Sequence, residues 1–281
     1  FDEKSVLPYF EGYTFADGTS TYRGFEVGEG GFVYAEPGMY VNVALIDVES
    51  MHPNSYIDEL YSGVKYTRKF KQILDLRLCI KHGDFEAARN MFEGKLAKYL
   101  DDEGSADALS YALKIAINSV YGLTSAKFKN AFYNEKNIDN IVAKRGALFM
   151  IDLLYSVQEA GFTVAHIKTD SIKIPNATPE IIQMVMDIGH RYGYNFEHEA
   201  TYEKMCLVNK SVYIAKYDEY GERTKGGKHA NQWTATGAEF QHPYIFKTLF
   251  SHEPVVFKDY CEKKEASGGG AIYLDNNEKL T

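Results

Sequence analysis

The sequence predicts an α+β fold, in which an antiparallel sheet is interrupted by a helical subdomain. Residues 39–48 alternate in polarity and are rich in β-branched side chains, which is typical of a strand. Residues 68 to about 100 show helical spacing, broken near His82 and Gly83. Two short apolar runs, 162–167 and 172–174, flank a polar tip and predict a β-hairpin.

The first half of the chain begins with short elements and then becomes helical. Residues 1–38 carry turn signals at 17–18 and 28–31, which predict loops and short strands. After the strand 39–48, the break at 82–83 predicts an antiparallel pair of helices within 68–100. A further helix is expected from Ser105, as N-cap, to Val120, with a stop at Gly122.

The second half alternates between helices and strands. An amphipathic helix is expected over 137–160, ending at Gly161. After the hairpin, Thr178 as cap and Pro179 in the first turn predict a helix to about residue 192. Strands are expected at 196–202 and 205–216, followed by a mixed tail in which 267–270 forms a loop or linker.

Composition excludes several classes of protein. The 281 residues are 45% hydrophobic and 25% charged, as in ordinary globular domains. The cysteines at 79, 206 and 261 form no CxxC pair, so we expect reduced thiols in a cytoplasmic protein rather than disulfides or a zinc site. No apolar run approaches the roughly 20 residues that cross a bilayer, so no membrane partner is expected. The start lacks signal-peptide features and a Met, which suggests a fragment or processed piece.

Charge is unevenly distributed. The net charge of −8 argues weakly against a simple nucleic-acid coat protein. From Lys65 to Lys81, however, the chain contains six basic residues and one acidic residue, a local charge of +5. A solvated helix face is the ordinary interpretation of such a run, and an anion-binding face is the alternative.

Two acids are the first candidates for chemistry. Asp47 ends the apolar strand and Asp170 lies at the hairpin tip, where each alone is commonly a cap or turn residue. Two such acids on adjacent strands can bridge the pair of divalent metals used in phosphoryl transfer. The pair is therefore more informative than either residue.

Cationic helix faces complement these acids. Lys114, Asn118 and Tyr121 recur at helical spacing and share one face, while Arg77 and Lys81 share a face of another helix. A core Tyr121 and a surface Lys114 are the structural alternatives. Together the two faces could clamp a triphosphate.

Three motifs in order resemble family B DNA polymerases. Residues 47–55 (DVESMHPNS) resemble motif A, D-x-x-S-L-Y-P-S, and residues 114–122 (KIAINSVYG) match motif B, K-x-x-x-N-S-x-Y-G. Residues 166–171 (HIKTDS) resemble motif C, Y-G-D-T-D-S. Residues 29–31 resemble the YxGG linker and 209–213 a KKxY-type motif. The resemblance covers roughly residues 25–220 and is greatest to bacteriophage members.

The resemblance implies a polymerase palm, an antiparallel sheet with packed helices, interrupted by a helical fingers insertion. The implied boundaries are a pre-palm segment at 1–38, palm at 39–64, fingers at 65–134, palm again at 135–220, and a partial thumb or C-terminal tail at 221–281.

The resemblance also implies roles for individual residues. Asp47 and Asp170 match the catalytic aspartates, and with the Val48 carbonyl they would hold two Mg²⁺ ions, for which Mn²⁺ could substitute. The implied nucleotide-binding residues are Ser50, Met51, His52, Arg77, Lys81, Lys114, Asn118 and Tyr121. The implied DNA-binding residues are Gly30, Gly31, Gly122, Thr169, Lys210 and Tyr213.

The implied activity is addition of dNTPs to a primer 3′-OH, releasing pyrophosphate. The implied partners are primer–template DNA, dNTPs, and a separate exonuclease or thumb chain or a processivity factor. If the chain is phage-encoded, the location would be the host cytoplasm. The 46 residues before Asp47 are too few for a proofreading exonuclease, so we expect one piece of a larger or split polymerase.

Two residues depart from the family pattern and keep alternatives open. Lys168 stands where motif C has its first Asp, and His52 replaces the Tyr that excludes ribonucleotides. Lys168 motivates a catalytically silent nucleic-acid-binding or assembly module with a polymerase fold. His52 motivates relaxed sugar selection, or an RNA-making, primase-like polymerase.

Overall fold

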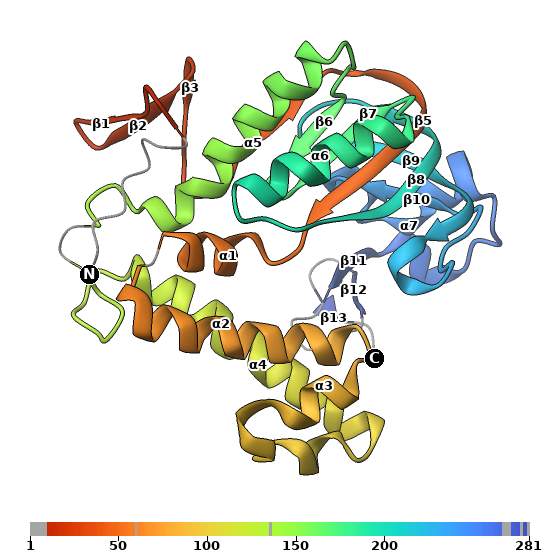
Figure 1. Cartoon of the computed structure of the whole chain (residues 1–281). Helices are drawn as coiled ribbons and strands as arrows, with labels where there is room; N and C mark the ends of the chain where they lie inside the picture. Colours follow the sequence, from red (N-terminus) through yellow and green to blue (C-terminus); the bar gives the residue numbers. More distant parts are fainter. Residues whose placement is uncertain (1–9, 60, 135–136, 266–270, 276–277, 280–281) are drawn as a thin grey trace. The chain divides into compact units, whose positions relative to one another are not determined.

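The computed structural model describes residues 10–59, 61–134, 137–265, 271–275 and 278–279. These residues form two compact units. The helical unit contains the described parts of residues 1–32, 49–152 and 189–195, and the sheet unit contains those of 33–48, 153–188 and 196–281. Both are drawn in Figure 1.

An antiparallel sheet organises the sheet unit. Within the described residues it has seven strands in the order β10-β9-β8-β5-β7-β6-β4, and every neighbouring pair is antiparallel. The strands are β4 (Val33–Ala35), β5 (Gly38–Val48), β6 (His166–Lys168), β7 (Ser171–Pro175), β8 (Phe196–Leu207), β9 (Tyr213–Glu222) and β10 (Trp233–Thr236).

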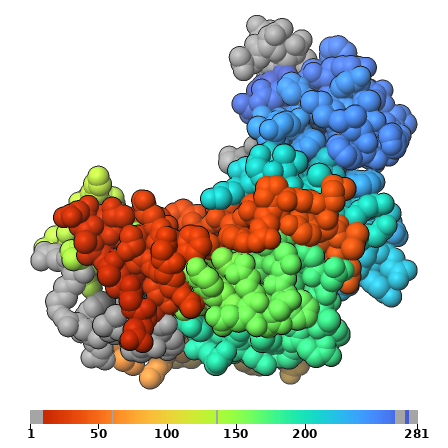
Figure 2. Space-filling model, turned by 90° about the horizontal axis from the view of Figure 1, so that it is seen from above, coloured from red at the N-terminus to blue at the C-terminus, as the bar shows by residue number. Residues whose placement is uncertain are grey.

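Alternating side chains build the core of this sheet. Val43 and Leu45 of β5 pack with Ala200 and Tyr202 of β8, because residues two apart on a strand share a face. Helix α6 (Pro179–Arg191) lies across the strands in Figure 1. In Figure 2 the orange-red segment containing β4 and β5 runs beside the green residues near 155–175, which agrees with the pairing of β4 with β6 and of β5 with β7.

Short elements complete the sheet unit after β10. They are α7 (Pro243–Phe246), a π-helical turn (Lys247–Ser251), and 3₁₀ turns at Arg223–Lys225, Ala238–Phe240 and Phe257–Tyr260. A second, three-stranded antiparallel sheet follows, made of β11 (Glu262–Glu265), β12 (Ala271–Asp275) and β13 (Glu278–Lys279).

The helical unit is built on two long helices, α2 (Gly63–Lys81) and α4 (Glu103–Thr124), which Figure 1 shows packed together. Phe70 and Leu74 of α2 share a buried cluster with Ile117 of α4. The remaining elements are β1 (Thr14–Ala16), β2 (Thr19–Tyr22), β3 (Phe25–Glu26), α1 (Met51–Asp58), α3 (Phe85–Asn90), two 3₁₀ turns (Met91–Gly94 and Ala97–Leu100), and the part of α5 (Ile141–Glu159) up to residue 152.

The structure confirms the α+β class and several predicted elements. The strand at 39–48 is β5, the hairpin is β6–β7, and the helix opened by Thr178 is α6, whose Ile181 N–H donates to Thr178 Oγ1 at 3.4 Å. The turn at Asp17 and Gly18 joins β1 to β2 with positive φ at both residues. Among the described residues, none of the helices has the length and apolar character needed to cross a bilayer.

Several predicted boundaries were wrong. The N-cap of α4 is Asp102, whose Oδ1 accepts the Ser105 N–H at 2.9 Å, and the helix passes Gly122 to end at Thr124. Asp102 takes the cap because a carboxylate accepts the free N–H groups of a first turn well. Gly122 does not stop the helix, since glycine lowers helix propensity without forbidding it.

Other predicted element boundaries also differ from those in the structure. The expected second helix within 68–100 is only the six-residue α3 followed by 3₁₀ turns, and α5 begins at Ile141. The strand expected to end at 202 continues to Leu207, and the next begins at Tyr213. The loop predicted at 267–270 lies outside the described residues.

Candidate functional site

Two carboxylates come together in the sheet unit. Asp47 lies near the end of β5, opposite Ser171 of β7. The N–H of Val48 donates to the carbonyl of Asp170, with N···O at 2.8 Å. Asp170 belongs to the two-residue connection between β6 and β7, and this turn lies beside the end of β5.

The hairpin turn is tight and strained. Lys168 and Ser171 pair, which leaves Thr169 and Asp170 to reverse the chain. The Asp170 N–H donates to the Lys168 carbonyl at 2.8 Å, and Thr169 has φ of 56°. A β-branched residue rarely adopts a positive φ, and such strain concentrates at functional sites. The turn therefore fixes the position of Asp170 at a conformational cost.

The electrostatics of the pair follow from burial and like charge. Burial, and then the nearby Asp170 carboxylate, raise the pKa of Asp47 to about 7. Glu199 and Glu197 of β8 raise it further, and Glu197 is the β8 residue opposite Asp47. The sequence reasoning missed both glutamates, although the alternation Glu197-His198-Glu199 places two acids on one face of a strand.

A buried lysine partly offsets this negative charge. Lys173 of β7 is only 3% exposed, and its charge lowers the pKa of Asp47. Burial lowers the pKa of Lys173 itself to about 8. Its Nζ lies 3.4 Å from Ser171 Oγ and 5.2 Å from the centre of the Tyr213 ring. Lys173 was also missed, although a lysine inside the apolar run Ile-Lys-Ile was a visible signal.

Lys210 and Tyr213, two of the predicted DNA-binding residues, lie beside the β6–β7 hairpin, where both contact His166. His166 of β6 is buried, and burial followed by the charge of Lys173 lowers its pKa to about 4. The neutral ring pairs through Nε2 with the Lys210 carbonyl at 3.1 Å and meets the Tyr213 ring edge-on at 5.8 Å. The Lys210 backbone and the Tyr213 ring are thereby tied to β6 and β7, while the Lys210 side chain is exposed.

The helical unit holds the predicted nucleotide-binding residues. Ser50, with φ of 59°, leads into α1, and Met51 is buried at its start. The His52 ring stacks on the Tyr121 ring of α4, with centroids 4.3 Å apart and planes within 18°. His52 and Tyr121 therefore pack face to face and join α1 to α4.

The cations of this unit differ in their surroundings. Lys81 Nζ and His82 Nε2 each lie 3.0 Å from Oε1 of Glu49, so Lys81 already has an anionic partner. Within the described part of the chain, Arg77 Nε is buried without a hydrogen-bond partner. Lys114 and Asn118 are exposed on α4, and no hydrogen bond joins their side chains to another described residue.

The three predicted DNA-binding glycines lie in a loop and on a helix. Gly30 and Gly31 lie in the loop after β3, and Gly31 has φ of 89°. Gly122 is exposed on α4, and a Cβ there would meet nothing within 4 Å.

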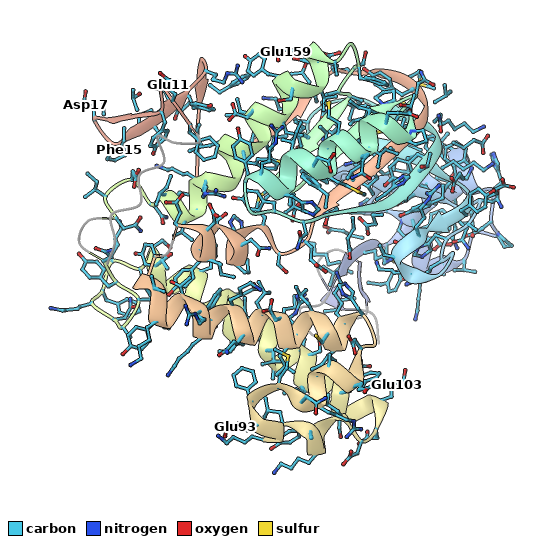
Figure 3. All side chains as sticks on the ribbon, viewed as in Figure 1. Glu11, Phe15, Asp17, Glu93, Glu103 and Glu159 are labelled. Carbon is cyan, nitrogen blue, oxygen red and sulfur yellow. The ribbon has the colours of Figure 1, made fainter. Side chains whose placement is uncertain are left out.

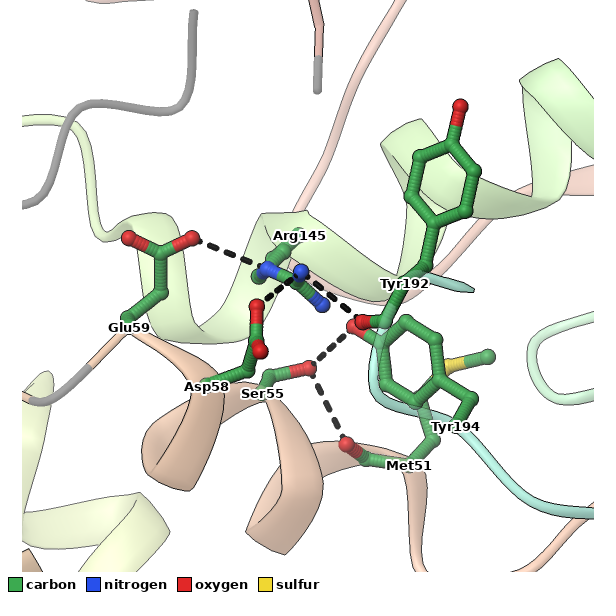
Figure 4. A network of polar contacts seen from close by, with 7 residues as sticks. All are labelled: Met51, Ser55, Asp58, Glu59, Arg145, Tyr192 and Tyr194. Atoms are coloured by element: carbon green, nitrogen blue, oxygen red, sulfur yellow. Dashed lines mark hydrogen bonds and ion pairs between the residues drawn. The ribbon is translucent and has the colours of Figure 1, made fainter. Parts of the chain in front are cut away.

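A buried arginine network fixes α1, as Figure 4 shows. Arg145 of α5 is 0% exposed, and its guanidinium pairs with Asp58, with Glu59 at 2.9 Å and with the Tyr192 carbonyl at 2.9 Å. Tyr194 lies under the guanidinium at 5.1 Å. The network anchors the end of the helix that begins with Met51 and His52. Sequence reasoning missed it, since Arg145 lies in an ordinary amphipathic helix.

Comparison with solved structures finds similar chains. No protein-family model matches the chain, and no curated protein matches its sequence. Among solved structures, the family B DNA polymerase from the hyperthermophilic archaeon Pyrobaculum calidifontis is similar, at 15% sequence identity and a TM-score of 0.49. The match covers 88% of this chain and 32% of that one, so the chain spans about a third of that polymerase.

Proposed function

We propose that this chain is the core of a template-directed DNA polymerase that adds dNTPs to a primer 3′-OH. The observation that supports the proposal is that the β6–β7 turn carrying Asp170 bonds to Val48, next to Asp47, and that the Asp170 charge helps to raise the pKa of Asp47. Like charges in a buried position are unfavourable unless a cation joins them. The ordered motifs around Asp47, Lys114 and Asp170 support the same function.

The donor set suits magnesium. Two carboxylates and the Val48 carbonyl offer only oxygen, the ligand type that Mg²⁺ and Mn²⁺ prefer. When bound, two such ions would activate the primer hydroxyl and neutralise the leaving pyrophosphate. Lys173 limits the negative charge that remains when they are absent.

The nucleotide would be held by the helical unit. Lys114 and Asn118 are exposed and available for phosphates, while Arg77 and Lys81 lie one turn apart on α2. A triphosphate must compete with Glu49 for Lys81, so binding would exchange an internal ion pair for an external one. The stacked pair His52 and Tyr121 would lie against the sugar and base. Backbone N–H groups of Ser50 and Met51 would complete the phosphate contacts.

In this proposal α2 to α4 serve as fingers and the antiparallel sheet as palm, within the boundaries expected from the motifs. The DNA would contact Lys210 and Tyr213, and also Gly30, Gly31, Gly122 and Thr169. A separate exonuclease or thumb chain, or a processivity factor, and a cytoplasmic setting belong to the same proposal.

Primer extension by the purified chain tests the proposal. With Mg²⁺, dNTPs and a primed template, we expect extension that the Asp170→Asn variant lacks, because this substitution keeps the shape and removes the charge. Extension with rNTPs as efficient as with dNTPs would favour the RNA-making alternative that His52 motivates. DNA binding with no extension under any metal would favour the silent module that Lys168 motivates.

A further inference from the structure

A second site in the helical unit lies outside the residues assigned above. It is a pocket of about 690 Å³ between the start of α2 and the loop at 125–134 that follows α4. Four aromatic rings line it, together with two small polar residues: Tyr61, Tyr66, Phe132, Tyr133, Ser62 and Asn134. Its volume lies in the range of small-ligand pockets, roughly 300–1,000 Å³.

The loop that carries two of these rings is fastened to α4. Asn130 Nδ2 donates to the Leu123 carbonyl at 3.1 Å, and its Oδ1 accepts the Phe132 N–H at 2.8 Å. The Tyr133 N–H donates to the Asn130 carbonyl at 3.1 Å. On the other wall, Tyr61 is buried against Tyr56 at 5.4 Å. The loop backbone and the Tyr61 ring are therefore held in place before a ligand binds, while the Tyr66 and Tyr133 rings are exposed and accessible to it.

The surroundings of the pocket are basic. The two segments that include the lining residues, 61–71 and 125–134, contain six Lys or Arg and no Asp or Glu, in a chain of net charge −8; one of the six, Lys71, is paired with Asp75 at 2.7 Å. Lys65 Nζ lies 5.9 Å from the Tyr66 ring, and Lys69 follows Tyr66 by three residues on the same side of α2. The acidic residues Glu93 and Glu103, labelled in Figure 3, lie away from the start of α2. Glu103 begins α4, whereas the loop at 125–134 follows the other end of that helix.

We infer that this pocket and its lysines bind single-stranded nucleic acid, with unpaired bases stacked on the rings and phosphates beside the lysines. Aromatic platforms within a positive groove bind single strands, because every base offers a flat face and every phosphate a charge. A duplex hides its base faces and fits the rings poorly. Assigning the strand as the unpaired template rests on the proposed function, whereas the binding itself does not.

Fluorescence anisotropy with a labelled 20-nucleotide oligo(dT) tests the inference on the full chain. Tyr66→Ala should weaken binding about 5- to 100-fold, the range expected for loss of one stacked base. Tyr99→Ala is the matched control, since Lys98 Nζ lies 4.9 Å from that ring but the pair lies outside the pocket. Lys65→Gln should lower the slope of log affinity against log salt by about 0.7, and Lys98→Gln should not.

Three outcomes overturn the inference: equal binding by wild type and Tyr66→Ala, equal losses in Tyr66→Ala and Tyr99→Ala, or an unlabelled 20-base-pair duplex that competes as well as the single strand. A pocket that serves a protein partner gives the first of these. Circular dichroism checks folding, and Tyr133→Ala on the loop supplies a second variant. Since Asp170→Asn should bind oligo(dT) normally, failure of extension and failure of this inference are separate results.

Discussion

Replacing Asp47 by Asn should stabilise the metal-free protein at alkaline pH while abolishing primer extension. The folded chain raises the pKa of Asp47 from 3.8 to about 7, so the folded state keeps a proton that the unfolded state releases. Stability therefore falls as the pH rises from about 4 to about 7, and the full loss is present at pH 8. Asparagine carries no charge, so the Asp47→Asn variant does not lose this stability as the pH rises.

The size of the effect follows from the pKa. A change of one in a pKa corresponds to about 1.4 kcal/mol, so moving from 3.8 to about 7 corresponds to at most about 4 kcal/mol. Partial solvent access to Asp47 reduces this to about 2–3 kcal/mol. For a chain of this size, 2 kcal/mol raises the unfolding midpoint by about 4–8 °C.

Thermal unfolding with chelator at pH 8 and at pH 5 measures the effect. The advantage of Asp47→Asn should shrink by more than half at pH 5, where wild-type Asp47 is protonated. Asp187→Asn, an exposed change on α6, is the control and should show no such dependence. Added Mg²⁺ should stabilise the wild type at pH 8 and not the variant. An Asn advantage equally large at both pH values, or none at pH 8, would refute the reasoning.

Four further substitutions have definite expected results. Arg145→Met should lower the free energy of unfolding by about 3–5 kcal/mol in urea titration, because it removes the buried cation between two carboxylates; a loss under 1 kcal/mol would contradict this. Gly146→Ala places a Cβ 2.3 Å from Met51 Sδ and should destabilise by about 1–3 kcal/mol, a loss that Met51→Ala in the same chain relieves in a double-mutant cycle. His52→Tyr should raise the preference for dNTPs over rNTPs in primer extension, and an unchanged preference counts against a role in sugar selection. Lys168→Asp should retain extension, and complete loss would show that Lys168 has a role of its own.

The sequence predicted best what local patterns determine. The strand ending in Asp47 and the hairpin carrying Asp170 were visible, because alternation and turn residues act over a few positions. The sequence predicted helix boundaries poorly where neighbouring residues compete for the same capping position. Asp102 and Ser105 are both good caps, and only the folded chain shows which one is used.

Residues that reach the site from distant segments could not be placed from the sequence. Glu199 and Lys173 act on Asp47 through strand register, and Arg145 acts on α1 from another helix. Register and helix packing are set by tertiary contacts, which leave no periodic signature in a single sequence. The sequence predicted a pairing of Asp47 with Asp170, and the structure adds the charges that surround Asp47.

The placement of the helices between β5 and β6 has a consequence for how the protein folds. Pairing of Asp47 with Ser171 closes a loop that contains the whole of residues 48–170. Closing a long loop is entropically unfavourable and slow, so contacts of this kind form late. During synthesis the ribosome must therefore release the entire insertion before the two acids can meet, and a nascent chain ending before β7 has no such carboxylate pair. Under the proposed function, metal affinity should then appear only once β7 has paired with β5.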